Sequence, residues 1–320
     1  MNELNDIKKA SRPTVAVIGL GGAGCNIITY LSKKNIAGAK IIAAHTDISH
    51  LVLQNAHKFL LMGKEKSRGK GCGGFPEVGA ACARESAEDI KREIEGFNIV
   101  FIVTGLGGGT GTGSAPVVAD IARSLGALTI SCLTMPFEIE SMRREHAKKA
   151  VQVLSEICDS VIIIDNTKLR EFAGNLPLKT AFAVANSLIG ALIKNVSETI
   201  TETCLMNLDF ADLKAVLEKK GIASFGIGEA EGSGRIEKAV QRAISMPILE
   251  IPDITASYGL LIQITGGQDM TLDEVAKVGE LMAQRLPNTK RVIWGAKIED
   301  AMTGRIRIMA LFTSVGNPFV

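Results

Sequence analysis

The stretch that decides the fold is Gly105-Leu106-Gly107-Gly108-Gly109-Thr110-Gly111-Thr112-Gly113-Ser114. It follows the apolar segment Asn98 to Thr104 and precedes a segment with helical periodicity. Because glycine has no Cβ, the backbone can approach an anion closely and adopt positive φ, so that N–H groups and the following helix N-terminus converge on phosphate oxygens. A flexible linker rarely occupies such a position, so the run predicts a phosphate-binding loop.

A second glycine-rich segment, Gly19-Leu20-Gly21-Gly22-Ala23-Gly24, also follows an apolar run. It matches G-x-G-x-x-G, and Asp47 lies 23 residues past Gly24, so alone it predicts a Rossmann dinucleotide site. A dinucleotide enzyme has no use for another phosphate loop at 105–113, so two such loops favour a mononucleotide triphosphate held from two sides. No segment has the lysine that a Walker A loop needs, which disfavours an ordinary P-loop NTPase.

Composition places the chain among globular proteins. Its 320 residues are 46% hydrophobic and suit one large or two medium domains. The 36 basic and 34 acidic residues balance, so charge gives no case for nucleic acid. The polar N-terminus lacks the apolar core of a signal peptide, and no apolar run reaches about 18 residues, so no direct membrane insertion is expected. Six cysteines without a C-x-x-C pair are expected to be reduced thiols of a cytoplasmic protein.

Apolar runs alternate with helical patterns through the first half of the chain. Six of these runs are expected to be strands: Thr14–Ile18, Lys40–Ala44, Phe59–Met62, Ile99–Thr104, Leu128–Thr134 and Val161–Ile164. Near-continuous apolar strands separated by helices predict an α/β fold with a parallel sheet covered on both faces. Ligands of such sheets bind beyond the carboxyl ends of the strands, where the glycine-rich turns lie. The first half is therefore expected to form a nucleotide-binding domain.

A long central helix and a smaller α+β domain are expected to follow. The segment Leu178 to Leu205 has apolar residues at helical spacing and is interrupted only by Gly190. From Gly221 onward the expected elements are Ala223–Gly226, Arg235–Ser245, Leu260–Thr265, Thr271–Gln284, Val292–Lys297 and Arg305–Thr313, giving two helices on a smaller sheet. The expected boundaries are 1–177, 178–205 and 206–320.

The run from Gly107 to Ser114 resembles the signature sequence of the tubulin/FtsZ family, and further motifs in family order extend the resemblance from Thr14 to about Thr313. The resemblance implies the tubulin/FtsZ fold, binding of GTP or GDP together with Mg²⁺, and GTP hydrolysis. It assigns no side chain as a direct metal ligand. The nucleotide-binding residues that it implies are Gly21, Gly22, Asn26, Asp47, Gly71, Cys72, Gly73, Gly107, Gly108, Gly109, Thr110, Gly111, Thr112, Gly113, Glu140, Arg144, Asn166, Phe182 and Asn186.

The resemblance gives two of these segments specific roles. The loop from Gly69 to Gly79 corresponds to the one that faces the γ-phosphate, with Cys72 among the departures from the family pattern. Glu140 is expected at the ribose hydroxyls and Arg144 at the phosphates, since a carboxylate accepts hydrogen bonds and arginine offers a fork of donors. The alternative for these two residues is a helix ion pair with each other.

The base is expected near Asn166, with Phe182 stacked on it. Asn186 is followed by Ser187 where the family has aspartate. An aspartate accepts both the ring N–H and the amino group of guanine, whereas a serine hydroxyl cannot do so bidentately. We therefore expect weaker discrimination between GTP and other purine triphosphates than an aspartate would give.

The segment Asn207-Leu208-Asp209-Phe210-Ala211-Asp212 begins the next expected helix. Its two acids are three residues apart, so both project from one face of the first turn. Read alone, they are a helix N-cap with a dipole-complementing acid. The spacing also matches the catalytic loop of the resembled family, which enters the nucleotide site of the neighbouring subunit. The resemblance therefore implies Asn207, Asp209 and Asp212 as catalytic residues, with the acids orienting the attacking water.

A loop of this kind implies self-assembly, because the acids and the nucleotide lie on different surfaces of one molecule. The contact is then head-to-tail and propagates into a homopolymeric filament. The family implies a cytoplasmic filament at the division site; the alternative is a relative that polymerises poorly and regulates another filament. Relatives continue into a C-terminal peptide that recruits membrane-anchor proteins, which makes such proteins candidate partners, while this sequence ends at Val320. No nucleic-acid partner is expected.

Overall fold

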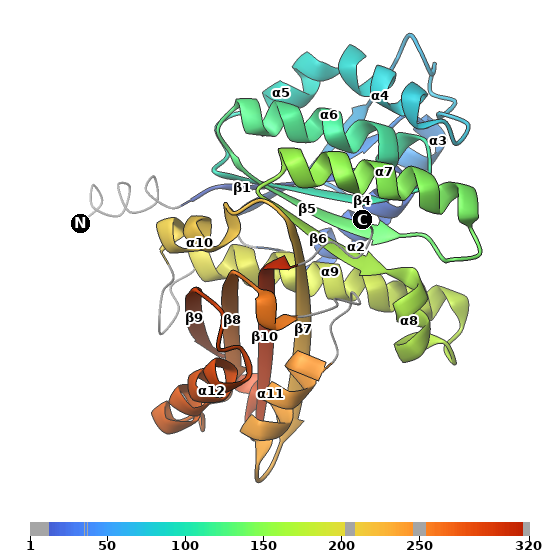
Figure 1. Cartoon of the computed structure of the whole chain (residues 1–320). Coiled ribbons are helices and arrows are strands. Elements are labelled where there is room, and N and C mark those ends of the chain that lie inside the picture. The colour runs from blue at the N-terminus through green and yellow to red at the C-terminus, as the bar shows by residue number, and fades with distance from the viewer. Residues whose placement is uncertain (1–12, 35, 37, 202–208, 246–253, 316–320) are drawn as a thin grey trace.

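One ten-stranded sheet with the order β3-β2-β1-β4-β5-β6-β7-β10-β8-β9 forms the centre of the protein in the computed structural model, which describes residues 13–34, 36, 38–201, 209–245 and 254–315 (Figure 1). Its first six strands are parallel: β1 (Val15–Leu20), β2 (Ala39–His45), β3 (Lys58–Leu61), β4 (Ile99–Gly105), β5 (Leu128–Met135) and β6 (Ser160–Asp165). The six strands and the parallel sheet expected from the sequence are confirmed, with strand ends shifted by one or two residues.

Helices cover both faces of this half of the sheet: α2 (Gly21–Lys34), α3 (Ile48–Leu51), α4 (Pro76–Glu85), α5 (Ala87–Ile94), α6 (Thr110–Ser124), α7 (Ser141–Ile157) and α9 (Leu178–Thr201). Helix α8 (Asn166–Ala173) packs against α9 in a small cluster of its own. Successive side chains of β1 enter different clusters. Ile18 packs in the cluster that includes α5, α6 and α7, while Val17 packs in the cluster that includes α2 and α9. Burial on both faces explains why the strands read as continuous apolar runs.

The second half of the sheet is mixed. It contains β7 (Ile222–Glu231), β8 (Gly259–Gly266), β9 (Arg291–Ile298) and β10 (Arg305–Val315). Strand β10 pairs antiparallel with both β7 and β8, and β8 pairs parallel with β9. Helices α11 (Arg235–Ser245) and α12 (Leu272–Arg285) cover one face, and α10 (Phe210–Leu217) and α9 cover the other. Two short turns, η1 (Ile254–Ala256) and η2 (Asp300–Met302), complete the described elements.

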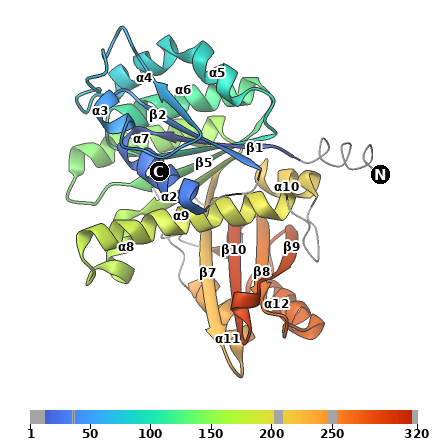
Figure 2. The same ribbon diagram turned by 180° about the vertical axis from the view of Figure 1, so that it is seen from behind.

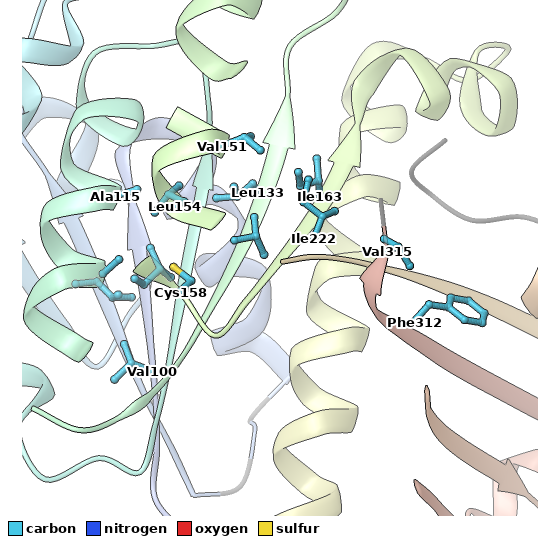
Figure 3. Packing of buried hydrophobic residues seen from close by; sticks show 14 of the residues in the cluster. Val100, Ala115, Leu133, Val151, Leu154, Cys158, Ile163, Ile222, Phe312 and Val315 are labelled. Atoms are coloured by element: carbon cyan, nitrogen blue, oxygen red, sulfur yellow. The ribbon is translucent and has the colours of Figure 1, made fainter. Parts of the chain in front are cut away.

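Strands β6 and β7 join the two halves into a single sheet, which the sequence did not reveal. The joint consists of two parallel pairs, of which the first is Val161 with Ile222. The buried apolar cluster continues across it, from Ile163 to Phe312 on β10 (Figure 3). Local hydrophobic patterns identify strands but not the strands they pair with. The pairing of β6 with β7 could therefore be seen only in the structure.

Helix α9 crosses both halves on one face of the sheet (Figure 2). Polar contacts tie its later turns to the second half, because Lys297 of β9 lies 2.8 Å from Glu198 and Thr199 donates to Gln263 of β8 at 2.8 Å. A helix of 24 residues is roughly 36 Å long, so its ends lie far apart in the molecule. Of the helix expected from Leu178 to Leu205, residues 202–205 lie outside the described residues.

The described cysteines are all free and buried, as expected. None of the described helices combines the length and the apolar character needed to cross a bilayer.

Gly24 provides a test of the packing of α2 on the sheet. A Cβ at this position would lie 2.2 Å from the Val103 carbonyl oxygen, and backbone cannot rotate away. We expect Gly24→Ala to destabilise the fold by about 1–3 kcal/mol through overpacking. The control is Gly279→Ala in α12, where a Cβ meets nothing within 4 Å and alanine should stabilise by up to about 1 kcal/mol. Urea unfolding midpoints that move equally for both variants would contradict this account.

Candidate functional site

A cavity of about 450 Å³ opens at the carboxyl ends of the parallel strands. Its walls come from the loops after β1, β4 and β5 and from the starts of α8 and α9. The lining residues are Gly21, Gly22, Ala23, Gly105, Leu106, Gly108, Gly109, Thr110, Gly111, Thr134, Pro136, Phe137, Glu140, Arg143, Asn166 and Phe182. Both glycine-rich loops therefore face one cavity, which lies where ligands of parallel sheets bind.

The backbone of the two glycine-rich loops forms the floor of this cavity. Gly21 and Gly107 have φ values of +68° and +98°, which side chains with a Cβ rarely adopt. A Cβ on Gly111 would lie 2.1 Å from the Thr104 hydroxyl oxygen. Helices α2 and α6 both begin at this floor. Their free backbone N–H groups and their two helix dipoles therefore favour a bound anion.

Three loops around the floor meet in a buried contact of hydroxyl and thiol groups. The hydroxyl oxygens of Thr46 and Thr110 are 2.6 Å apart, and the Cys72 sulfur lies 3.2 Å from the Thr46 oxygen and 3.6 Å from the Thr110 oxygen. The thiol of Cys72, a residue expected at the nucleotide, is buried in this contact, which holds the loop 69–75 against its neighbours.

The opposite end of the cavity carries aromatic rings. The rings of Phe137 and Phe182 meet edge to face with centroids 6.2 Å apart. Asn166 begins α8 beside them, next to the N-cap residue Asp165. Ser187 donates its hydroxyl to the Val184 carbonyl at 2.7 Å, so its hydrogen is committed to its own helix. This end therefore offers apolar ring surface to a planar group.

The adjacent residues Arg143 and Arg144 have different contacts: the sequence assigned the phosphate contact to Arg144, but it is Arg143 that lines the cavity. Arg144 forms an ion pair with Asp165 at 2.8 Å and donates to the Pro136 carbonyl at 2.8 Å. Arg143 instead lines the cavity and donates to Glu140 at 2.8 Å. The helix ion pair considered for Glu140 thus forms with Arg143, three residues along, and not with Arg144.

The turn after β2 lies beside the floor. The Asp47 carboxylate caps α3 by accepting from the Ser49 N–H at 2.8 Å, and the His45 Nδ1 accepts from the Asp47 N–H at 2.8 Å. Burial, with a smaller effect of the neighbouring His50, lowers the pKa of His45 from 6.5 to about 4. His45 is therefore neutral near pH 7 and its ring lies against His50, with centroids 4.8 Å apart.

The residues expected at the nucleotide that do not line this cavity are Asn26, Asp47, Gly71, Cys72, Gly73, Gly107, Thr112, Gly113, Arg144 and Asn186. Gly107 and Thr112 support the floor, since the Gly107 N–H donates to the Thr112 hydroxyl at 2.8 Å. The lining residues that sequence reasoning missed are Ala23, Gly105, Leu106, Thr134, Pro136, Phe137 and Arg143. For Thr134, Phe137 and Arg143 the available signal was the carboxyl end of the buried strand β5, because Thr134 lies near the end of this strand, Phe137 follows it and Arg143 lies in the first turn of α7.

The two expected catalytic acids lie at the other end of the molecule. Asp209 caps α10 by accepting from the Ala211 N–H at 3.2 Å. Asp212 is exposed and makes no hydrogen bond or ion pair within the described part of the chain. The cavity borders the start of α9, whereas α10 follows its far end (Figure 1). The cavity and the two acids therefore lie at opposite ends of α9. Asn207 lies outside the described residues.

Two family descriptions match the chain. Residues 14–174 match the "Tubulin/FtsZ family, GTPase domain" and residues 221–316 match the "FtsZ family, C-terminal domain". Among curated proteins, the cell division protein FtsZ of Methanothermobacter thermautotrophicus is 44% identical over 99% of this chain and 84% of its own length. Cell division protein FtsZ 1 of Archaeoglobus fulgidus is 41% identical over 99% of this chain and 86% of its own.

Solved structures give the same assignment. An FtsZ dimer from M. jannaschii superposes with a TM-score of 0.91 at 42% identity, covering 98% of this chain and 91% of that one. CetZ2 from Haloferax volcanii, solved as a GTPγS-bound protofilament, has a TM-score of 0.81 at 21% identity over 95% of this chain and 94% of that one, a likeness of fold alone.

The lowered pKa of His45 gives stability a pH dependence. The unfolded chain binds a proton at this histidine near pH 6.5 and the folded chain only near pH 4, so unfolding takes up a proton between these values. Stability should therefore fall as pH drops from 6.5 toward 4, by on the order of 2–3 kcal/mol from this group. We expect His45→Gln to flatten this part of the profile in urea unfolding at pH 5 and pH 7.5; parallel profiles would contradict the assignment.

Proposed function

The chain belongs to the tubulin/FtsZ family of GTPases, and from that premise we propose that it is a cell-division cytoskeletal protein whose GTPase site is completed by the next subunit of a head-to-tail filament. The observation that carries the proposal is the separation of two half-sites. The nucleotide cavity borders the first turns of α9, and the two acids follow the far end of this 24-residue helix, which is roughly 36 Å long. A second copy brings the two together.

The cavity suits a guanine nucleotide that lies across the strand ends. We assign the base to Phe182 and Asn166, the ribose to Glu140, and the phosphates to the floor formed by the two glycine-rich loops. Arg143 adds a guanidinium from the wall, where arginine's fork of donors suits phosphate. Because both loops face one cavity, the proposal favours a mononucleotide over a dinucleotide.

The donor set near the floor also fits Mg²⁺. The described residues contain no cluster of three or more His, Cys, Asp or Glu side chains, so an all-protein metal cage is absent from that part of the chain. Mg²⁺ in nucleotide sites is held mainly by phosphates and water with one or two carboxylates. Asp47 supplies one carboxylate beside the floor, with Gly71 next to its second oxygen. When bound, Mg²⁺ offsets phosphate charge.

Exposed apolar side chains around the cavity support docking of a second copy. Ile139 is 92% exposed and Met142 is 73% exposed, and both flank the lining residues of the loop after β5. Phe75 and Leu176 are further exposed apolar side chains, and Leu176 shares a hollow with Phe182. Large exposed apolar groups gathered at one end of a molecule are typical of an interaction surface.

The chemistry follows from the arrangement. Asp212 of one subunit, which has no hydrogen bond or ion pair with the residues that the structure describes, enters the cavity of the next and accepts a proton from the attacking water while orienting it. Asp209 holds the turn in place as the N-cap of α10 and adds negative charge beside the water. We assign Asn207 to the same loop on the family spacing. Loss of the γ-phosphate then removes contacts at the joint and weakens the filament.

We place this filament in the cytoplasm at the division site, with membrane-anchor proteins as further partners, on the strength of the family. We also propose that the chain divides into a nucleotide domain (1–177), a connecting helix (178–205) and a C-terminal domain (206–320). The contact of α9 with both halves of the sheet supports its role as the connector.

Substitution of Asp212 tests whether the active site is shared between two subunits. We expect Asp212→Ala to bind GTP like the wild type and to lose at least about 100-fold in turnover, because the water-orienting base is gone. Asp209→Ala should lose turnover and also about 1 kcal/mol of stability through the lost helix cap. The measurement is phosphate release with Mg²⁺ as protein concentration rises. In the wild type, activity per subunit should be near zero below a threshold and rise above it.

A flat, non-zero specific activity would mean a site contained within one subunit. No hydrolysis at any concentration would favour a relative that polymerises poorly. The matched control is Asp300→Ala, an exposed acid on η2 outside the cavity and α10, which should hydrolyse GTP normally.

Ser187 tests the base assignment. Its hydroxyl hydrogen is donated to its own helix at 2.7 Å, so the side chain has one acceptor oxygen for guanine and cannot bind both guanine donors bidentately. We expect Ser187→Asp to raise the preference for GTP over ATP by about tenfold in competition binding, since a carboxylate accepts both guanine donors. Ser187→Asn, which offers one acceptor, should give a smaller gain; an unchanged ratio in both variants would place the base elsewhere.

A further inference from the structure

The Nε2 atom of His50 is buried without a hydrogen-bond partner. Within the described residues, the other buried side-chain atoms in this condition are the hydroxyl oxygens of Ser197 and Ser224, which lie in α9 and β7, away from the cavity. A buried polar atom without a partner is destabilising and rare in native proteins, so each one requires an explanation. For His50, we find the explanation in its position beside the first glycine-rich loop.

The His50 ring packs against the phosphate floor at Gly22, although His50 is not itself among the residues that line the cavity. A Cβ built on Gly22 would lie 3.7 Å from both Cε1 and Nε2 of His50, so the ring lies over the backbone of the first glycine-rich loop. Gly22 itself lines the cavity, in the first turn of α2. The partnerless nitrogen is therefore beside the position where phosphate oxygens meet backbone N–H groups.

The strand order indicates which phosphate lies nearest to His50. The base-binding groups Phe137 and Asn166 follow β5 and β6, and the phosphate loops follow β4 and β1. His50 follows β2, the next strand in the same direction across the sheet. A nucleotide lying along these strand ends runs from base to ribose to phosphates toward β2. The phosphate farthest from the base is then the one closest to His50.

The neighbours of His50 leave this nitrogen available. His45 packs against the ring with centroids 4.8 Å apart, and the Asp47 carboxylate binds backbone N–H groups of α3. The contact with His45 fixes the ring, and the cap holds one oxygen of the Asp47 carboxylate, Oδ1, against the backbone of α3. No side chain in the described residues competes for Nε2.

We propose that the Nε2–H of His50 donates a hydrogen bond to the terminal phosphate of a bound nucleoside triphosphate, and that His50 thereby favours the triphosphate over the diphosphate. The proposal rests on the proposed function, because it requires that the cavity bind a guanine nucleotide. It adds a residue outside the two glycine-rich loops that detects whether the last phosphate is present.

The test is calorimetric titration with GTPγS and with GDP at protein concentrations below the assembly threshold. We expect His50→Ala to weaken GTPγS binding about tenfold, as for a lost hydrogen bond to a charged group, and GDP binding less than about twofold. Retained GDP affinity also demonstrates that the variant is folded. His50→Gln, which keeps an N–H donor, should recover part of the loss. His146→Gln, on α7 outside the cavity, should change neither affinity.

Two results would overturn the role of His50: an equal loss for both nucleotides in His50→Ala, or no loss for either. Failure of the wild-type protein to bind GTPγS and GDP would instead overturn the proposed function. The two failures are thus distinguishable in one set of titrations.

Discussion

The close approach of backbone to backbone at a few glycines is the constraint on which the site depends. A Cβ on Gly24 would lie 2.2 Å from the Val103 oxygen, and a Cβ on Gly113 would lie 1.8 Å from the Pro76 oxygen. These contacts pack α2 on β4 and α6 on α4. As a result, two loops that are about 80 residues apart in the chain present their N–H groups to one cavity. Side chains at these positions would separate the helices and with them the phosphate floor.

The connecting helix α9 separates the cavity from the proposed catalytic acids, so the proposed active site depends on how subunits assemble. The cavity lies at the start of α9 and the acids follow its end, and the continuous sheet with its shared core keeps the two ends fixed relative to each other. A rigid molecule with complementary half-sites at opposite ends favours a head-to-tail contact, which propagates into a filament. Under the function proposed above, hydrolysis in such a filament is coupled to assembly, because each subunit contributes one half of the site.

Much of this architecture was predictable from the sequence. The six apolar strands, the long helix and the glycine-rich loops are local patterns, so their identities follow from period and composition. The pairing of β6 with β7 was not predictable, because partner choice is a tertiary property. At the site, the direction of each side chain determines which residues line the cavity, and this direction could not be predicted from the sequence. Arg144 turns to Asp165 while Arg143 lines the cavity, and adjacent arginines look alike in a sequence.

The most direct test of the central claim is complementation between two inactive variants. Asp212→Ala keeps the cavity and loses the acid, while Gly108→Asp, where a Cβ has open space, places a negative charge in the phosphate floor and keeps the acid. Our account predicts that an equimolar mixture recovers up to about one quarter of wild-type GTP hydrolysis, because one in about four joints unites an intact cavity with an intact acid. A mixture as inactive as its components would contradict a site shared between subunits.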